Sequence, residues 1–398
     1  MVELSSRLKL IKPSATMEIT AKAKALKASG VDIIGFGAGE PDFGTPDFVK
    51  DAAIKALNDG QTKYTDAAGM PALREELASF YKRSENLDYK ASNTIITAGG
   101  KQALYNLLQA IISKGDEVII PAPYWVSYPD MTLLAEGVPI ILDTDEKDNF
   151  AIDPDKLESL ITSKTKAIIL NSPSNPSGAV FDESTLVAVS KIALKHDLLV
   201  IADEIYKDIY YGDRPLRSLP FYHDEIRKNL VIVSGLSKNF SMTGWRIGWA
   251  LADEKIIKAL STIQGQSTSN PVTFSQYGAL AALKEGPTHI KEWVAQFKER
   301  RDLLVDQLSN IEGISTLTPD GAFYLFPNIS GWFGKRWNDL ILKDSFDVTK
   351  FLLEEAEIAV VPGAVFGADN NIRISYALRM EQISEGIERI KRVAKLLK

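Results

Sequence analysis

The sequence predicts a two-domain α/β protein whose larger domain is built on a mainly parallel sheet. A chain of 398 residues is too long for one typical hydrophobic core. Its middle repeats one unit, in which a short β-branched run leads into a polar loop and then into a helical pattern. Strands that alternate with helices at this spacing are typical of a parallel sheet that is covered on both faces.

Seven apolar runs are the expected strands of this sheet. Most of them lead into loops that contain Gly, Pro, Asn or Ser, which interrupt regular structure. The last run follows its predecessor without a full helical crossover, so an antiparallel orientation is expected there. In chain order the runs are 93–97, 117–120, 138–142, 166–170, 198–201, 230–233 and 246–251.

The sequence pattern changes after about Gly286, where a charged amphipathic stretch is followed by a mixture of short strands and helices. The second domain is expected to begin there. A charged amphipathic stretch, 290–308, suits a helix that joins two lobes. We predict a large domain at 46–286 and a small α+β domain formed by 287–398 together with the N-terminal arm, 1–45. The expected strands of the small domain are 322–326, 359–361 and 372–375.

Composition and charge argue against several classes of function. The net charge of −6 comes without blocks of one sign, which argues against binding to nucleic acid or to an anionic membrane. The sequence has no cysteine, which rules out disulfides, thiolate nucleophiles and Cys-ligated zinc. Its three histidines, His196, His223 and His289, are far apart, so we expect neither a metal site nor a Ser-His-Asp hydrolase.

No targeting or membrane segment is expected. Residues 1–12 lack the apolar core of a secretory signal, and no apolar run approaches the length needed to cross a bilayer. We therefore expect a cytoplasmic protein.

Unusual polar and aromatic residues follow the ends of the expected strands. Ligands of open parallel sheets bind beyond the carboxyl ends of the strands, so residues from five strand ends would meet in one pocket. These residues are Gly100, Lys101, Trp125, Asn175, Asp203, Tyr206, Lys238 and Arg246.

The chemistry of this set is that of a site for a phosphorylated pyridine ring. The start of a helix at Gly100 offers backbone N–H groups to a phosphate, and Arg246 could add a bidentate contact. Trp125 could supply a flat face for an aromatic ring. Asp203 could pair with a protonated ring nitrogen. Lys238 would then be the amine that forms a Schiff base and later moves a proton.

Two further residues could hydrogen-bond a phenolic oxygen on the ring, namely Asn175 and Tyr206.

Each residue of the set, taken alone, also fits a structural role. A lysine after a strand is usually a solvated surface residue, and a Gly-Gly pair before a helix is usually a turn. A buried tryptophan is usually core, and a charged residue at a strand end usually forms an ion pair. Their joint occurrence in this order favours the cofactor site.

The motifs of the chain resemble those of fold-type I pyridoxal-phosphate aminotransferases of the class I aspartate aminotransferase family, over essentially the whole length. Singly several motifs are weak, but together and in order they are specific. They are Gly39-Glu40-Pro41-Asp42-Phe43, Lys63-Tyr64-Thr65, Gly99-Gly100-Lys101-Gln102, Pro123-Tyr124-Trp125-Val126-Ser127-Tyr128, Asn171-Ser172-Pro173-Ser174-Asn175-Pro176-Ser177-Gly178, Ala202-Asp203-Glu204-Ile205-Tyr206, Ser237-Lys238-Asn239-Phe240-Ser241-Met242-Thr243-Gly244-Trp245-Arg246-Ile247-Gly248 and Arg373-Ile374-Ser375.

This resemblance implies a role for each matching residue. Lys238 would hold pyridoxal 5′-phosphate covalently, Asp203 would keep the pyridine nitrogen protonated, and Trp125 would stack on the ring. Asn175 and Tyr206 would contact the ring hydroxyl. The phosphate would be lined by Gly100, Lys101, Arg246 and a serine, and Tyr64 of the second subunit of a homodimer would reach it.

One departure from the family pattern concerns the phosphate site. Many relatives have a hydroxyl residue three positions before the lysine, where this chain has Gly235. Ser234 or Ser237 could take its place. The resemblance also implies that Arg373 clamps the substrate α-carboxylate, helped by the backbone of Gly39 and by Asn175, while the small domain closes.

The resemblance further indicates a dicarboxylate substrate. The segment 261–273 contains no arginine for a distal carboxylate. In the subgroup that this chain resembles, two lysines serve that purpose, and they match Lys12 and Lys101. We therefore expect an aspartate:2-oxoglutarate aminotransferase that works by a ping-pong reaction, with prephenate as a second substrate.

Other functions stay open on this scaffold. It also carries aromatic and alanine aminotransferases and carbon–sulfur lyases, so the fold does not choose between them. A ligand-binding module of a transcription regulator is the alternative outside enzymes, although the chain has no basic patch for DNA.

Overall fold

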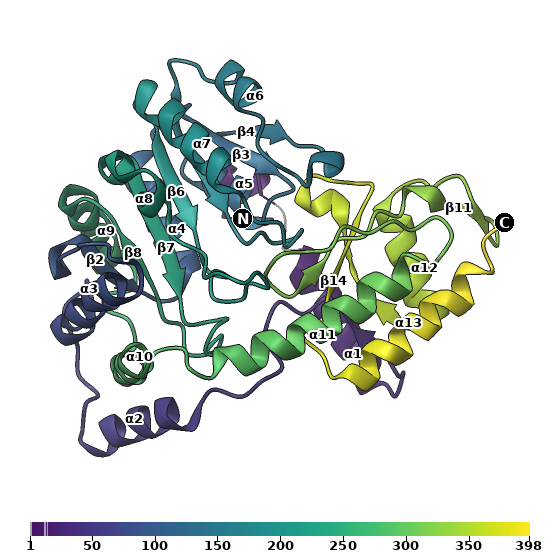
Figure 1. The fold of residues 1–398 in the computed structure, drawn as a ribbon, viewed down its shortest axis with the longest axis horizontal. Coiled ribbons are helices and arrows are strands. Elements are labelled where there is room, and N and C mark those ends of the chain that lie inside the picture. Colours follow the sequence, from purple (N-terminus) through teal and green to yellow (C-terminus); the bar gives the residue numbers. More distant parts are fainter. Residues whose placement is uncertain (1, 12, 14) are drawn as a thin grey trace.

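The computed structural model describes residues 2–11, 13 and 15–398, which form two lobes (Figure 1). The long helix α11 (Ile290–Leu308) runs from the sheet lobe into the lobe that contains the C-terminus. This is the joining helix that the amphipathic stretch 290–308 predicts. In the described part of the chain, no helix is both long enough and apolar enough to cross a membrane.

The other α-helices are α1 (Ala15–Ala28), α2 (Asp47–Asn58), α3 (Pro71–Glu85), α4 (Gly100–Ile111), α5 (Ser127–Leu134), α6 (Pro154–Ser159), α7 (Glu183–Lys195), α8 (Leu219–Tyr222), α9 (Glu254–Ser267), α10 (Thr273–Glu285), α12 (Ser345–Ala356) and α13 (Met380–Ala394). The strands are β1 (Ile34–Gly35), β2 (Thr94–Thr97), β3 (Glu117–Ala122), β4 (Val138–Asp143), β5 (Thr165–Asn171), β6 (Leu199–Asp203), β7 (Leu230–Gly235), β8 (Gly248–Leu251), β9 (Tyr324–Leu325), β10 (Arg336–Trp337), β11 (Leu340–Ile341), β12 (Ile358–Ala359), β13 (Val361–Pro362) and β14 (Ile372–Ser375).

Among the described residues, seven strands form one sheet in the order β2-β8-β7-β6-β5-β3-β4. Strand β8 is antiparallel to both of its neighbours, and the other neighbouring pairs are parallel. The mainly parallel sheet and the antiparallel seventh run are therefore confirmed. Strand β8 begins at Gly248 rather than at position 246, because Arg246 has a left-handed backbone (φ 56°) that no extended strand accommodates.

Both faces of this sheet are covered by helices. Ile169 and Val231 face a layer that includes residues of α4, α5 and α9, whereas Ile168 and Ile232 face a layer that includes residues of α3, α7 and α10. This alternation follows from the period of two along a strand. Because both faces are closed, the edge formed by the strand ends is where polar side chains of the sheet can meet a ligand.

The second lobe has a core of its own, built mainly by α11, α12, α13 and the strands near the C-terminus. Ile34 and Phe36 from the N-terminal part join it, as do Tyr206 and Ile209 from the segment after β6. The domain boundaries at 46 and 286 stay a prediction, but these last two residues bind the segment after β6 to the second lobe.

Two of the strands expected in this lobe differ from their predicted ranges. The run 359–361 is two short strands, because β12 pairs with β1 while β13 pairs with β14. The run 322–326 is reduced to β9, in which Ala322 is excluded by its left-handed backbone (φ 58°). Strand β14 matches its expected range and is the middle strand of the set β13-β14-β9.

Candidate active site

The expected site residues lie at the carboxyl-terminal edge of the sheet. Asn175 follows β5, Asp203 ends β6 and Lys238 follows β7, and these three strands are neighbours. The same edge carries Gly100 after β2, Trp125 after β3 and Arg246 before the antiparallel β8.

Lys238 directs its amine toward the N-terminal segment. Its Nζ donates a hydrogen bond to the carbonyl oxygen of Gly39. Burial lowers the pKa of Lys238 to about 8, against the opposing attraction of the Glu40 carboxylate. A lysine with a lowered pKa loses its proton more readily near neutral pH, which is what a nucleophile or a proton carrier requires.

Asp203 is a buried carboxylate that accepts hydrogen bonds from neutral donors. The hydroxyl of Tyr128 donates to its Oδ2 (2.8 Å), and the backbone N–H of Ile205 donates to its Oδ1 (3.2 Å). Burial raises the pKa of Asp203 to about 6, although both hydrogen bonds favour the ionised form. A buried carboxylate of this kind has a strong preference for a cationic partner.

Asn175 and Arg373 meet across the two lobes. Nη1 of Arg373 donates to Oδ1 of Asn175 (2.9 Å), and Nη2 donates to the carbonyl oxygen of Gly37 (2.8 Å). The Nε of Arg373 is buried and has no hydrogen-bond partner among the described residues. Because its two bonds go to neutral oxygens, this guanidinium is a buried cation that can still take an anion.

Tyr206 lies between the sheet edge and the second lobe. Its hydroxyl is 2.7 Å from the hydroxyl of Tyr324 on β9, and both side chains are buried. The amine of Lys238 is 5.8 Å from the centre of the Tyr206 ring. The residue therefore connects the lysine side of the site with the strand set that carries Arg373.

Backbone N–H groups and a guanidinium meet at the start of α4. Gly99 has φ +87°, a conformation that favours glycine, and a Cβ there would collide with the guanidinium of Arg246. Arg246 donates to the carbonyl oxygens of Thr243 (2.7 Å) and Ala98 (3.2 Å). An exposed guanidinium beside a helix N-terminus is a suitable place for a phosphate.

The geometry explains why position 235 carries no hydroxyl. A Cβ on Gly235 would lie 2.9 Å from both the Gly248 Cα and the Ile247 carbonyl oxygen, closer than real Cβ atoms come. Of the two alternatives, Ser234 already donates to the carbonyl oxygen of Glu204 (3.3 Å). Ser237 is the buried serine next to Lys238 and is the better candidate for the missing hydroxyl.

Trp125 and Lys101 lie together at the same edge. The amine of Lys101 is 4.6 Å from the centre of the Trp125 ring, and that ring contacts Tyr128 edge to face at 5.3 Å. Partial burial and the nearby charge of Arg246 lower the pKa of Lys101. One flat aromatic face and one amine are thus available beside the start of α4.

One expected residue, Tyr64, is not brought into this pocket by a single chain. Tyr64 is 89% exposed, so within one chain it contributes nothing to the site. Lys12 lies outside the described residues. No group of three or more metal-binding side chains occurs in the part of the chain that the structure describes.

Sequence reasoning missed two tyrosines of the site. Tyr128 stands in a motif that was recognised, but its bond to Asp203 is not evident without the fold, because 75 residues separate them. Tyr324 lay in the expected strand 322–326, and no role in the site was predicted for it. A tyrosine at a buried strand position, where phenylalanine would suffice, is the available signal, since a buried hydroxyl needs a partner.

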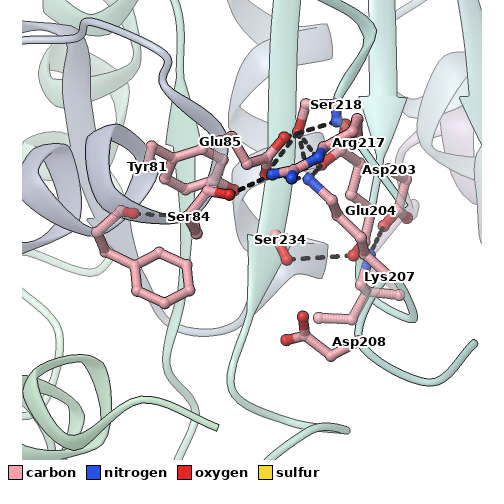
Figure 2. A network of polar contacts seen from close by, with 12 residues as sticks. Tyr81, Ser84, Glu85, Asp203, Glu204, Lys207, Asp208, Arg217, Ser218 and Ser234 are labelled. Carbon is pink, nitrogen blue, oxygen red and sulfur yellow. Dashed lines mark hydrogen bonds and ion pairs between the residues drawn. The ribbon is translucent and has the colours of Figure 1, made fainter. Parts of the chain in front are cut away.

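Sequence reasoning also missed a cluster of buried charged groups next to the site. Figure 2 shows Glu85, Lys207 and Ser218 pointing toward one another beside the segment of Asp203 and Glu204. Lys207 forms ion pairs with both glutamates, and Ser218 donates to Glu204 (2.6 Å). We call Glu85, Glu204, Lys207 and Ser218 the buried charge cluster.

Known proteins resemble this chain over its whole length. The family model for aminotransferase class I and II matches residues 31–390. The aspartate aminotransferase of Bacillus subtilis is 45% identical over 391 residues, which is 98% of each chain. The probable aspartate/prephenate aminotransferase of Aquifex aeolicus is 44% identical over 391 residues, again 98% of each.

Solved structures agree in fold. The aspartate aminotransferase of Rhizobium meliloti has a TM-score of 0.96 at 37% identity, with 100% of both chains covered. That of Thermus thermophilus, solved with maleate, has a TM-score of 0.92 at 41% identity, covering 99% of this chain and 100% of its own. The expected fold-type I architecture, an α/β fold with a mainly parallel central sheet, is confirmed.

Proposed function

Since the chain belongs to the aminotransferase class I and II family, we propose that it transfers the amino group of aspartate to 2-oxoglutarate with pyridoxal 5′-phosphate. The observation that carries this proposal is the pair of buried groups with shifted pKa values at neighbouring strand ends. The pKa of Lys238 is lowered to about 8. Asp203 is a buried carboxylate with a raised pKa, and a cationic ligand would stabilise its ionised form.

The residues fit both ends of the cofactor. At the phosphate end, the start of α4 at Gly100 offers N–H groups, Arg246 offers a guanidinium, and Ser237 offers a hydroxyl. At the ring end, Asp203 would pair with the protonated pyridine nitrogen, and Trp125 would cover one face. Asn175 and Tyr206 would donate to the ring oxygen.

When bound, the cofactor supplies an electron sink for the charge left as the substrate Cα loses its proton. The protein supplies the proton carrier, because the Lys238 amine can accept that proton and return it to a different atom. Asp203 would hold the ring nitrogen in its protonated form and so keep the sink effective. Closure of the second lobe would exclude water while the proton is held on Nζ.

Arg373 is proposed to bind the α-carboxylate of the substrate. Its guanidinium is buried and donates to two neutral oxygens, and its Nε has no hydrogen-bond partner in the part of the chain that the structure describes. Gly39, whose carbonyl oxygen faces Lys238, would provide backbone contacts on the same side. A planar guanidinium held in this way binds a carboxylate with two parallel hydrogen bonds.

Lys101 is proposed to recognise the distal carboxylate, together with Lys12. Its amine already lies over Trp125, close to where the cofactor ring would stack. Several relatives, including that of Aquifex aeolicus, are named probable aspartate/prephenate aminotransferase, which supports prephenate as a second amino acceptor. Both compounds carry two carboxylates, so one pair of lysines would serve either.

A homodimer would complete the site. Tyr64 is exposed in one chain, as are several apolar residues of the N-terminal segment. We infer that Tyr64 of a second copy reaches the phosphate beside Arg246, and that the exposed arm packs on the partner. These arm residues are Val2, Leu4, Leu8 and Leu10. A cytoplasmic location also stays a proposal.

The test is the absorption spectrum of the purified protein, loaded with cofactor, before and after addition of L-aspartate. We expect a yellow protein that bleaches with aspartate at far lower concentration than with L-alanine or L-phenylalanine. Prephenate or 2-oxoglutarate should then restore the colour. A stronger response to alanine or phenylalanine would keep the chemistry and reject the dicarboxylate pocket, whereas a protein that takes up no cofactor would reject the enzyme.

Lys101→Ala sharpens the same test. It should weaken the response to aspartate more than the response to alanine, because alanine has no distal carboxylate. An equal loss for both amino acids would show that Lys101 serves the phosphate rather than the substrate.

A further inference from the structure

The hydroxyls of Tyr206 and Tyr324 form a pair at the place where the two lobes meet. They are 2.7 Å apart, their side chains are 4% and 1% exposed, and their rings meet edge to face at 5.6 Å. The two residues are 118 positions apart in the sequence. A contact of this kind is a specific link between the segment after β6 and strand β9.

Each hydroxyl of the pair carries one proton, and either of the two could donate to the other. Burial raises the pKa of both phenols, so both stay protonated at neutral pH. A phenol has one proton to donate. If Tyr206 donates to the ring oxygen of the cofactor, it can only accept from Tyr324, which must then be the donor within the pair.

The ring of Tyr324 has a second contact. The guanidinium of Arg373 lies over it at 4.5 Å, a cation–π geometry. Its hydroxyl also lies beside Gly39, where an added Cβ would come within 3.3 Å of the oxygen. The same side chain therefore contacts the tyrosine proposed for the cofactor and the arginine proposed for the substrate carboxylate.

We propose that Tyr324 is a positioning residue: its hydroxyl donates to Tyr206 and so directs the Tyr206 proton toward the ring oxygen, while its ring supports Arg373. This inference rests on the proposed function, because it acts through residues assigned there. Hydrogen bonds in series polarise one another, so a donor behind Tyr206 makes Tyr206 itself a stronger donor.

Tyr324→Phe separates the two contacts, because it removes the hydroxyl and keeps the ring. Weaker donation to the ring oxygen disfavours the form of the bound cofactor that has lost a proton. The pH midpoint of its colour change should therefore rise by about half a unit to one unit. We expect kcat to fall about threefold to tenfold, while KM for aspartate changes less than about twofold.

A matched control exists in the same lobe. Tyr376 and Tyr211 form another hydroxyl pair, at 3.0 Å, and Tyr376 also donates to the carbonyl oxygen of Ala322. Tyr376→Phe should lower stability about as much as Tyr324→Phe, yet leave the colour midpoint and kcat unchanged. A variant series that includes Tyr206→Phe completes the cycle.

In that cycle, adding Tyr324→Phe to Tyr206→Phe should shift the midpoint no further, because Tyr324 acts through Tyr206. Additive shifts, or a Tyr324→Phe protein with the wild-type midpoint, would overturn the inference while leaving the proposed function intact. A wild-type protein that never becomes coloured with cofactor would overturn both.

Discussion

Two lysines follow neighbouring strands of the sheet and have opposite surroundings. Lys207 comes four residues after the end of β6, and Lys238 comes three residues after the end of β7. Lys207 is held by two carboxylates and a serine in the buried charge cluster (Figure 2), whereas Lys238 donates to the carbonyl oxygen of Gly39. Position at the sheet edge therefore does not distinguish a reactive lysine from a structural one.

The partners set the charge of each lysine. Burial alone would lower the pKa of Lys207, but the carboxylates of Glu204 and Glu85 raise it above its usual value. For Lys238, burial prevails and lowers the pKa to about 8. A lysine with matched opposite charge is locked as a cation, and a lysine without it can exchange its proton. The four predictions below test this difference, beginning with the largest expected effect.

Lys238→Ala should remove turnover while the protein still binds pyridoxal phosphate. The variant loses the amine that moves the proton, so we expect kcat to fall by at least about a thousandfold. Steady-state transamination and a cofactor-binding titration measure the two effects separately. Turnover at the wild-type rate would show that another base moves the proton.

Lys207→Met should act on stability instead. The substitution leaves Glu85 and Glu204 buried without their cation, and the free energy of unfolding should fall by about 3 to 5 kcal/mol. Urea unfolding measures the loss. The control is Lys195→Met, whose exposed ion pair with Glu158 (2.7 Å) should change stability by less than about 1 kcal/mol.

The same variant also tests the division of roles. If folded Lys207→Met protein lost as much kcat as Lys238→Ala, the buried charge cluster would belong to the catalytic machinery. We expect a much smaller loss, because the cluster contacts the segment of Asp203 and Glu204 without supplying a group to the reaction.

Asp203→Asn should lower kcat about tenfold to a hundredfold, because an amide cannot stabilise a protonated ring nitrogen as a carboxylate does. The fold should persist, since the hydroxyl of Tyr128 can still donate to the amide oxygen. Circular dichroism checks the fold and single-turnover kinetics check the rate. A rate within twofold of wild type would show that the Asp203 carboxylate has no role in the reaction.

The last prediction concerns the dependence of stability on pH in the cofactor-free protein. Between about pH 8 and 10.5 the folded state holds fewer protons on Lys238 than the unfolded state does. The free energy of unfolding should therefore rise with pH across this window, by about 3 kcal/mol in all. Urea unfolding of wild type and Lys238→Met should differ in slope, and parallel curves would contradict the lowered pKa.

Several parts of the fold followed from pattern alone. The strand runs at 93–97 and 230–233 and the helix at 290–308 were predictable because their apolar periods match a buried strand and an amphipathic helix. The split of 359–361 between two partners was not predictable, because strand pairing depends on which segments the chain brings alongside. The left-handed backbone at Ala322 and Arg246, which interrupts the expected strands, was also not predictable, since neither residue type favours a positive φ.

By itself the sequence determined the family, the sheet and the residue types of the site, because these depend on local pattern and on order along the chain. Tertiary structure alone decided the partners. It paired Tyr128 with Asp203, Tyr324 with Tyr206, and Lys207 with two carboxylates over separations of up to 122 residues. The protonation of a buried group depends on its desolvation and on its nearest charges. Both are properties of the folded interior, which is why two lysines in similar sequence positions differ in what they can do.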